Sequence, residues 1–248
     1  MFRVLWASIL DLVYPQPVDC LYCGGVKKAG DYELCGECLG AIEFIRQPSC
    51  MKCGKPLSAE CSHCADCTGQ VFSFAKALPV AVYRGWLKDV IYAFKFRRQV
   101  ELAKPLARMM AGKVAAAGLG FDIILPVPMH PDRLHLRGYN HASILAEYVG
   151  GFLGIPVGAQ TLKRCIDTLP QRTLKRSARE RNLYNVFRVT KAELIKDKRV
   201  LLIDDIYTTG FTAEGCSAAL LAGGAHSVVV SILAIGLDIS RNLSNSTE

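Results

Sequence analysis

The sequence predicts an α/β protein in which a parallel sheet with helices on both faces follows a small N-terminal zinc ribbon domain. Nine of the 11 cysteines lie between Cys20 and Cys67, mostly as C-x-x-C pairs. Beyond them, short runs of branched apolar residues alternate with segments whose apolar residues recur at helical spacing, which is the pattern of an α/β domain. A chain of 248 residues is long enough for one such domain and a smaller one.

Three parts are expected along the chain: an N-terminal helix and double zinc ribbon at 1–70, an α/β domain at 71–237, and a polar, disordered tail at 238–248. The apolar stretch from Phe2 to Val13 is short, carries Asp11 and lacks a basic cluster, so we expect a packing helix rather than a secretory signal. No run approaches the ~20 apolar residues that span a bilayer. These features predict a cytoplasmic protein without a membrane span.

Four closely spaced cysteine pairs predict two zinc sites. Two residues between cysteines allow both thiolates of a turn to point at one tetrahedral ion, and a following glycine permits the tight backbone. The expected ligands are Cys20, Cys23, Cys35 and Cys38 for one ion and Cys50, Cys53, Cys64 and Cys67 for the other. Cys61 or His63 could replace Cys64, the ions could bind interleaved pairs, and disulfides or buried thiols are a further alternative. The expected role is structural, because zinc commonly stabilises a segment too small to hold a core.

The remaining elements follow from apolar periodicity and from helix- and strand-breaking residues. After a junction at 71–79, the expected elements are a strand at 80–84, helices at 86–94 and 101–117 with the second broken near Pro105, a strand at 121–128 ending in Pro126-Val-Pro128, a helix at 144–152, a strand at 200–203, a helix from Thr212 to a stop at Gly223, and a strand at 226–235. Lys95, Arg97 and Arg98 form a basic corner that we expect to be solvated.

The stretch from Val200 to Thr212 carries the main functional signal. An apolar strand meets Asp204 and Asp205, and a Thr-Thr-Gly-x-Thr turn then leads into a helix for which Thr212 is the expected N-cap. Backbone N–H groups in such a turn can hold an anion, and the two carboxylates can accept hydrogen bonds from ribose hydroxyls. The pattern therefore predicts a site for a ribose 5-phosphate group. The sequence contains no G-x-x-x-x-G-K-[ST] loop of the nucleoside triphosphatase type.

Positive charge is concentrated outside the cysteine-rich part. The formal charge is +8 for the whole chain, −2 for residues 1–70 and +10 for residues 71–248, which indicates phosphorylated ligands or nucleic acid as partners. Arg133 and Arg137 follow the proline turn and are suited to holding pyrophosphate. Residues 163–188 hold eight Lys and Arg against two acidic residues. We expect a basic loop there that closes over a phosphorylated ligand, or that is simply solvated.

Together these pieces resemble the ComF family, which includes the GntX-type proteins and joins a double zinc ribbon to a phosphoribosyltransferase-like domain. The resemblance runs from Cys20 to about Gly236 and rests on the paired cysteines, Pro126-Val-Pro128, Arg137-Gly-Tyr-Asn140, Gln171, Arg179, Asn182, Phe187 and Leu201–Thr212. The last stretch also resembles the phosphoribosyl pyrophosphate (PRPP) signature of type I phosphoribosyltransferases. His141 departs from the family pattern, which usually has Gln at this position.

The resemblance implies a doubly wound sheet of about five strands, PRPP binding with Mg2+, and a part in natural competence, where incoming single-stranded DNA is handled in the cytoplasm. The residues implied as PRPP ligands are Asp204, Asp205, Thr208, Thr209, Gly210, Phe211, Thr212, Arg137 and Arg179. Implied partners are PRPP or a related phosphoribosyl ligand, single-stranded DNA and other competence proteins. Two interpretations stay open, since no residue identifies an acceptor. One is a phosphoribosyltransferase, and the other is a nucleic-acid-binding accessory factor without transfer activity.

Overall fold

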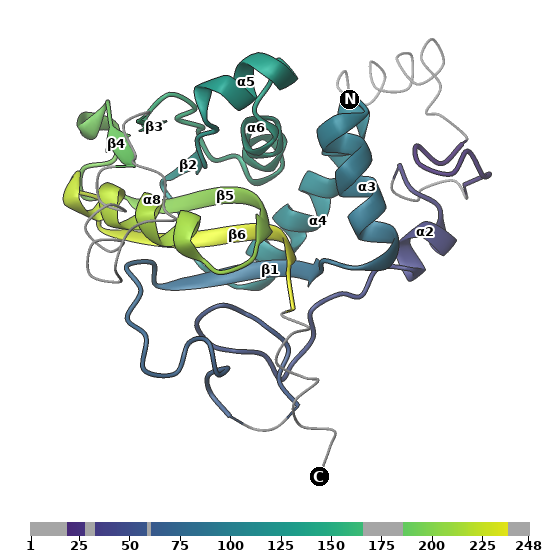
Figure 1. Ribbon diagram of the computed structural model, residues 1–248, viewed down its shortest axis with the longest axis horizontal. Coiled ribbons are helices and arrows are strands. Elements are labelled where there is room, and N and C mark those ends of the chain that lie inside the picture. Colours follow the sequence, from purple (N-terminus) through teal and green to yellow (C-terminus); the bar gives the residue numbers. More distant parts are fainter. Residues whose placement is uncertain (1–18, 28–32, 59–60, 166–185, 238–248) are drawn as a thin grey trace, which may run out of the picture. The chain divides into compact units, whose positions relative to one another are not determined.

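The computed structural model describes residues 19–27, 33–58, 61–165 and 186–237 (Figure 1). The chain forms two compact units, Met1–Ala41 and Ile42–Glu248. The described part of the first unit contains one short helix, α2 (Gly36–Gly40). The second unit contains the sheet and also the segment from Cys50 to Cys67. The boundary expected near residue 70 stays a prediction, because compactness does not test whether the ribbon folds on its own.

A four-stranded parallel sheet forms the centre of the larger unit. Its strands, in spatial order, are β1 (Lys76–Val82), β6 (Ser227–Ile235), β5 (Arg199–Tyr207) and β2 (Ile123–Pro126). Leu202 of β5 is in register with Val230 on one side and with Leu125 on the other. Two strands are longer than predicted. β1 begins at Lys76, inside the expected junction, and β5 continues through the two aspartates to Tyr207.

The two edges of the sheet explain why the length of β1 and the number of strands differ from the prediction. β1 is an edge strand, so Pro79 within it removes no hydrogen bond that a second neighbouring strand would need. On the opposite edge, Val157 adds only a single bridge to Ile124 of β2. The described residues therefore form a parallel sheet of four strands rather than about five.

Helices connect the strands in the manner of an α/β unit. They are α3 (Gly85–Phe96), η1 (Val100–Leu102), α4 (Ala103–Ala116), α5 (Pro131–Arg137), α6 (His141–Leu153), η3 (Ala192–Leu194) and α8 (Phe211–Ala222). The expected break near Pro105 is wrong. This proline lies in the first turn of α4, where its missing N–H has no intrahelical partner to lose. The short helix α5 was not expected. It begins at Pro131 and ends at Arg137, and its C-cap is Gly138, whose φ is 82°.

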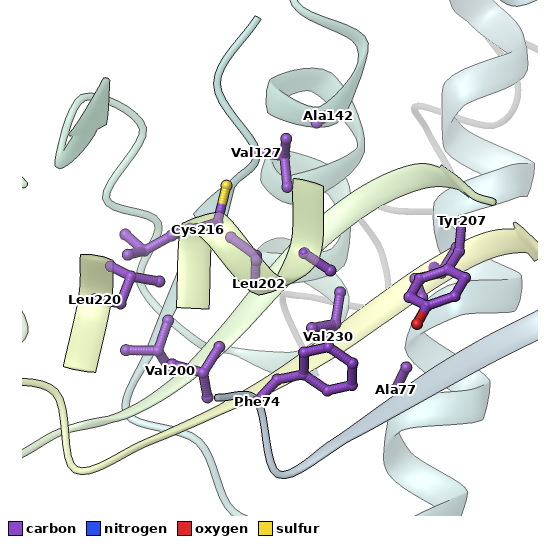
Figure 2. Packing of buried hydrophobic residues seen from close by; sticks show 14 of the residues in the cluster. Phe74, Ala77, Val127, Ala142, Val200, Leu202, Tyr207, Cys216, Leu220 and Val230 are labelled. Atoms are coloured by element: carbon purple, nitrogen blue, oxygen red, sulfur yellow. The ribbon is translucent and has the colours of Figure 1, made fainter. Parts of the chain in front are cut away.

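Each face of the sheet is covered by helices. Val200 and Leu202 share one apolar cluster with Cys216 and Leu220 of α8 (Figure 2). Alternation places Leu201 on the opposite face, where it is fully buried and where α4 and α6 contact the strands. This architecture confirms the predicted fold class, a parallel sheet with helices on both faces after an N-terminal cysteine-rich segment.

A separate antiparallel pair of strands flanks the basic segment. β3 (Leu162–Arg164) pairs with β4 (Phe187–Val189). The two ends of the segment expected as a loop at 163–188 are therefore regular strands, because each finds a partner in the other. Residues 166–185, which include Arg179, lie outside the described residues. No helix within the described ranges is long and apolar enough to cross a membrane.

Candidate ligand-binding site and cysteine clusters

Eight cysteines form two groups of four. In each group the Sγ atoms all lie within 4.8 Å of one another. The groups are Cys20, Cys23, Cys35 and Cys38 in the smaller unit and Cys50, Cys53, Cys64 and Cys67 in the larger unit. Each group uses sequential rather than interleaved pairs. Cys61 and His63 belong to neither group, so Cys64 keeps its predicted place.

The spacing of the sulfur atoms fits zinc and does not fit disulfides. Thiolates at ~2.3 Å from a tetrahedral ion lie ~3.8 Å from one another, whereas a disulfide requires ~2.05 Å. In the first group, the Sγ atoms of Cys20 and Cys38 are 3.8 Å apart. In the second group, those of Cys53 and Cys64 are 3.5 Å apart. The two groups therefore fit two structural zinc ions.

Both clusters are built on the same kind of turn. Gly24 and Gly54, which follow the first cysteine pair of each cluster, have φ of 70° and 74°, a conformation that strains any other residue. Their N–H groups donate to the carbonyl oxygens of Cys20 and Cys50 at 2.9 and 2.8 Å. A Cβ atom at Gly54 would also collide with Pro79 of β1. Glycine is therefore required at Gly54 both by the turn and by the sheet beneath it.

The turn between β5 and α8 ends in a glycine that caps the helix. Thr208 and Thr209 are exposed, and Gly210, with φ of 80°, is the N-cap of α8. The prediction of Thr212 as N-cap is therefore wrong, because the helix begins at Phe211 and Thr212 lies in its first turn. A left-handed glycine here takes the place of a capping side chain. The N–H groups of the first turn have no intrahelical acceptors and point at the space where an anion could bind.

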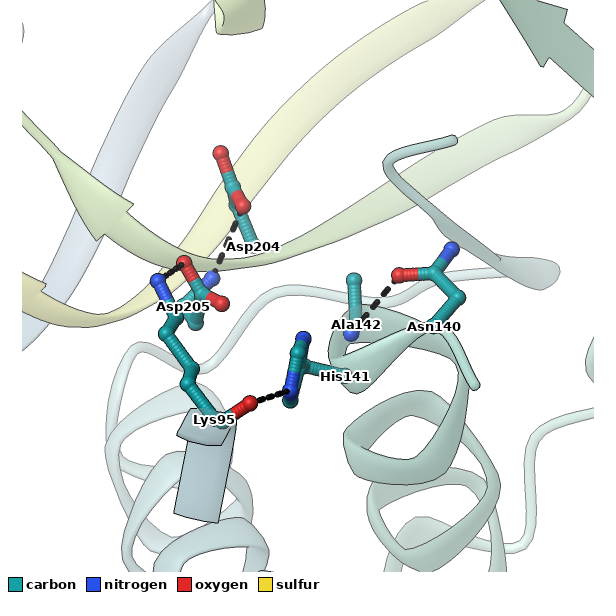
Figure 3. A network of polar contacts seen from close by, with 6 residues as sticks. All are labelled: Lys95, Asn140, His141, Ala142, Asp204 and Asp205. Atoms are coloured by element: carbon teal, nitrogen blue, oxygen red, sulfur yellow. Dashed lines mark hydrogen bonds and ion pairs between the residues drawn. The ribbon is translucent and has the colours of Figure 1, made fainter. Parts of the chain in front are cut away.

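The two aspartates lie near the end of β5, two residues before this turn, and differ in their surroundings. The Asp205 Oδ1 atom lies 2.7 Å from Nζ of Lys95 at the end of α3, and both side chains are 14% exposed (Figure 3). Asp204 accepts a hydrogen bond of 2.9 Å from the N–H of Asp205. Burial, and then the charge of Asp205, raises the pKa of Asp204 to about 7. One carboxylate therefore has a counterion, and the other gains and loses its proton near neutral pH.

His141 lies beside this ion pair at the start of α6. Its side chain is fully buried, and its Nε2 donates to the carbonyl oxygen of Lys95 at 3.2 Å (Figure 3). Burial lowers the pKa of His141 to about 4, so the ring is neutral and carries its proton on Nε2. The Nδ1 atom is buried and finds no hydrogen-bond partner within the described ranges. The position at which the family usually has Gln thus presents a neutral acceptor near the aspartates.

A basic pocket of about 360 Å3 adjoins the ion pair. It is lined by Lys95, Phe96, Arg98, Arg133, Leu136, Arg137 and Tyr139. The guanidinium group of Arg137 lies over the ring of Phe96, 4.5 Å from its centroid. Lys95 both lines this pocket and pairs with Asp205. The expectation of a solvated corner is therefore wrong for Lys95, which is held in a partly buried ion pair, although Arg97 and Arg98 are exposed.

Comparisons with known proteins establish the family. A model described as "Double zinc ribbon domain" matches residues 9–68. The chain is 33% identical over 218 residues to Competence protein F of Haemophilus influenzae, a match that covers 85% of this chain and 94% of that protein. The chain belongs to the ComF family.

Two further similarities place this ComF chain among known proteins. DNA utilization protein YhgH of Salmonella typhimurium is 29% identical over 219 residues, covering 86% of this chain and 95% of that protein. Among solved structures, a purine phosphoribosyltransferase from Pyrococcus horikoshii Ot3 is similar over 54% of this chain and 73% of its own, with 21% identity and a TM-score of 0.35. The sequence relatives define the family, and the fold follows from the strand order and helix contacts of the ComF chain itself.

The structure of this ComF chain brings most of the predicted ligand residues to one end of β5. The two aspartates and residues 208–212 are continuous there, and Arg137 is connected to them through the pocket that Lys95 also lines. Arg179 lies outside the described residues. Lys95 was missed as a site residue. Its position four residues after Ile91 and eight after Leu87, both buried, would have placed it on the inward side of α3.

Proposed function

We propose that this ComF protein binds PRPP, or a related phosphoribosyl ligand, at the carboxyl end of β5. The proposal rests on three features that follow one another within residues 204–212. Two adjacent carboxylates come first, then a turn that ends in Gly210, and then the N-terminus of α8. Asp204 and Asp205 would accept hydrogen bonds from the 2′ and 3′ hydroxyls of the ribose. The N–H groups of Thr208, Thr209 and the first turn of α8 would hold the 5′-phosphate.

The basic pocket is where the pyrophosphate of such a ligand would lie. Arg133 and Arg137 line it, and Arg179 from the basic segment would complete its positive charge. Mg2+ would reach the site with the ligand and neutralise pyrophosphate oxygens, because this ion is commonly bound through substrate phosphates and only one or two carboxylates. Lys95 lies between the two halves of the site, so its ammonium group could turn from Asp205 to a phosphoryl oxygen as Asp205 receives a ribose hydroxyl.

Phosphoribosyl transfer is the enzymatic form of this proposal. An acceptor would form a bond to the anomeric carbon of the ribose as the bond to pyrophosphate breaks, and the positive pocket would stabilise the leaving pyrophosphate. The described residues do not identify the acceptor. Release of pyrophosphate from PRPP in the presence of a panel of nucleobases and amines would show transfer, and binding without release would assign the site to ligand sensing.

Calorimetric titration of PRPP with Mg2+ into the full chain tests the binding proposal. Ribose 5-phosphate and pyrophosphate, titrated separately, report on the two halves of the site. We expect PRPP to bind more tightly than either fragment, because it occupies both halves at once. Absence of PRPP binding by zinc-loaded protein would contradict the proposal.

The biological setting that we propose is DNA handling in natural competence, in the cytoplasm and with other competence proteins as partners. This part of the proposal is supported by the relatives, which are called Competence protein F in Haemophilus influenzae and DNA utilization protein YhgH in Salmonella typhimurium. Deletion of the gene should lower transformation by linear DNA without lowering the amount of DNA bound at the cell surface. Equal loss of surface binding and transformation would place the protein at an earlier step.

A second candidate function, binding of single-stranded nucleic acid, is favoured by the surface next to the pocket. The rings of Tyr92 and Phe96 are tilted by 35° to each other with centroids 4.9 Å apart, and the two residues are 51% and 54% exposed. Arg97 lies over Tyr92 with its guanidinium carbon 5.7 Å from the ring centroid. Exposed aromatic rings among arginines are typical of surfaces on which bases stack while phosphates are neutralised.

The salt dependence of single-stranded DNA binding tests this second function. The slope of log affinity against log salt should be roughly −0.7 for each phosphate contact. Replacing Arg97, Arg98 and Arg133 together should flatten the slope by about two, and replacing Arg172, Lys175, Arg176 and Arg179 together is the comparison for the basic segment. If neither set of substitutions changes the slope, DNA binds at another surface. Affinity that does not respond to salt would contradict the candidate.

A further inference from the structure

We propose that the second cysteine cluster positions the phosphate-binding turn, with Tyr207 as the residue that transmits its effect. This cluster consists of Cys50, Cys53, Cys64 and Cys67, and the turn runs from Thr208 to Phe211. The ligand part of the inference rests on the function proposed above. The positioning part concerns the protein without ligand and is testable separately.

Tyr207 forms the floor of the turn. It is the last residue of β5 and is 6% exposed. A Cβ atom built on Gly210 would lie against the hydroxyl and Cζ of the Tyr207 ring, so the ring fills the space directly beside the backbone of Gly210. The carbonyl oxygen of Tyr207 accepts a hydrogen bond of 2.8 Å from Gly236 at the end of β6. The left-handed backbone at Gly210 is thus supported by a fixed aromatic ring.

Tyr207 also packs in the core that contains the second cysteine cluster. Tyr207 belongs to one apolar cluster with Cys50, Cys53 and Cys67, and Figure 2 shows it at the edge of this packed core. A shift of the metal-bound turns would therefore reach Gly210 through this shared core and the Tyr207 ring.

A second connection joins the cysteine segment to the start of α8. Ser73, six residues after Cys67, donates its backbone N–H and its hydroxyl to the two carboxylate oxygens of Glu214 at 2.7 and 2.6 Å. Glu214 lies in the first turn of α8, directly after the residues whose N–H groups would hold the phosphate. This bidentate contact fixes the rotation of the helix start relative to the cysteine segment.

The cysteine turns are themselves fixed to the sheet. The carbonyl oxygen of Lys52 accepts a 2.7 Å hydrogen bond from the N–H of Ala77 in β1. The ammonium group of Lys52 donates to the carbonyl oxygens of Phe72, Phe74 and Ala75 at 3.3, 2.5 and 3.2 Å. A metal that holds the four cysteines together therefore holds a body that touches the sheet, Tyr207 and, through Ser73, the first turn of α8.

Matched cysteine variants of the full chain test the positioning role. Cys50→Ser and Cys20→Ser each remove the first ligand of a cluster, and both cysteines are 3% exposed. Each variant should lose one zinc ion. In hydrogen–deuterium exchange without ligand, Cys50→Ser should raise exchange of the amides at 208–214 about tenfold, as expected for local loosening, whereas Cys20→Ser should leave them unchanged. Unchanged exchange in Cys50→Ser, or an equal rise in both variants, would overturn the proposal.

Substitutions of Tyr207 keep the test decisive if Cys50→Ser does not fold. Tyr207→Leu removes the floor of the turn and should raise exchange at 208–214 while the zinc content stays at that of the wild type. Tyr207→Phe keeps the ring and should behave as the wild type. Normal exchange in a folded Tyr207→Leu variant would contradict the role of this residue.

The ligand readout separates this inference from the proposed function. In titrations with PRPP and Mg2+, Cys50→Ser and Tyr207→Leu should bind at least about tenfold more weakly than Cys20→Ser. If the wild type binds no PRPP but the exchange pattern is as stated, the ligand proposal fails and the positioning role stands. If PRPP binds equally well to all variants, the positioning role fails and the ligand proposal stands.

Discussion

At the level of single residues, the proposed ligand site centres on the contact between Lys95 and Asp205. The pair is partly buried, with 2.7 Å between Nζ and Oδ1, and it occupies a carboxylate that we propose for a ribose hydroxyl. Removing one partner leaves the other charge unpaired in surroundings of low polarity, which is costly. Lys95 is therefore the counterion of Asp205 in the ligand-free protein.

Substitution of either aspartate should weaken PRPP binding. Asp204→Asn or Asp205→Asn replaces a charged acceptor with a neutral one, a loss of about 1.5–3 kcal/mol, which corresponds to roughly 10- to 150-fold in affinity. Calorimetric titration measures the change, with a thermal melt of each variant to show that it is folded. The solvent-exposed variant Asp132→Asn is a control that should bind as the wild type does. Asp variants with unchanged affinity would show that the ribose lies elsewhere.

The raised pKa of Asp204 makes the stability of the ligand-free protein depend on pH. A carboxyl group with a higher pKa in the folded state stabilises the fold below its unfolded pKa, and this contribution is lost as the pH rises through about 7. The melting temperature should therefore fall as the pH rises from about 5 to about 7 and level off above that, and Asp204→Asn should reduce the fall. Melts of both proteins at constant zinc concentration provide the comparison. Equal slopes with pH would mean that Asp204 ionises in its ordinary range.

At the level of elements, the turn between β5 and α8 supplies the atoms that we propose contact the phosphate. Its donors are backbone N–H groups, so Thr208→Ala should change PRPP affinity by no more than one hydroxyl contact, about 0.5–1.5 kcal/mol. Gly210→Val should abolish binding, because φ at Gly210 is 80° and a Cβ atom would strike the Tyr207 ring. Titration of the two variants gives the contrast. Comparable losses in both would indicate that threonine side chains, and not the backbone, hold the ligand.

The elements also show how far the sequence determines fold and site. Branched apolar runs predicted the strands β2, β5 and β6, because buried parallel strands favour continuous apolar residues. They did not predict that β1 begins at Lys76, since tolerance of Pro79 depends on an edge position that only the strand order reveals. The aspartates and the turn were predicted from local sequence. The partnership of Lys95 with Asp205, 110 residues apart, depends on how α3 packs and has no local signal.

At the level of the whole molecule, the two cysteine clusters belong to different compact units. Loss of one zinc ion should therefore affect the unit that holds it and leave the other zinc ion bound. Elemental analysis should find about two zinc ions per chain, one for each set of four thiolates. Removing both with a chelator should lower the melting temperature, since the binding energy of a structural metal contributes to folding. Cys20→Ser and Cys50→Ser should each retain one ion. Wild-type protein that contains no metal and has oxidised cysteines would contradict the assignment.

The position of β6 has a consequence for the newly made chain. This strand lies between β1 and β5 although it is the last described strand in the sequence. During synthesis the cysteines, β1 and β5 emerge from the ribosome first. The edges of β1 and β5 that later pair with β6 stay unpaired until residues 227–235 emerge. Metal capture at the second cluster can thus precede closure of the sheet. A nascent chain short of zinc would spend that interval with an open sheet edge and a loose cysteine segment, the state most exposed to aggregation and proteolysis.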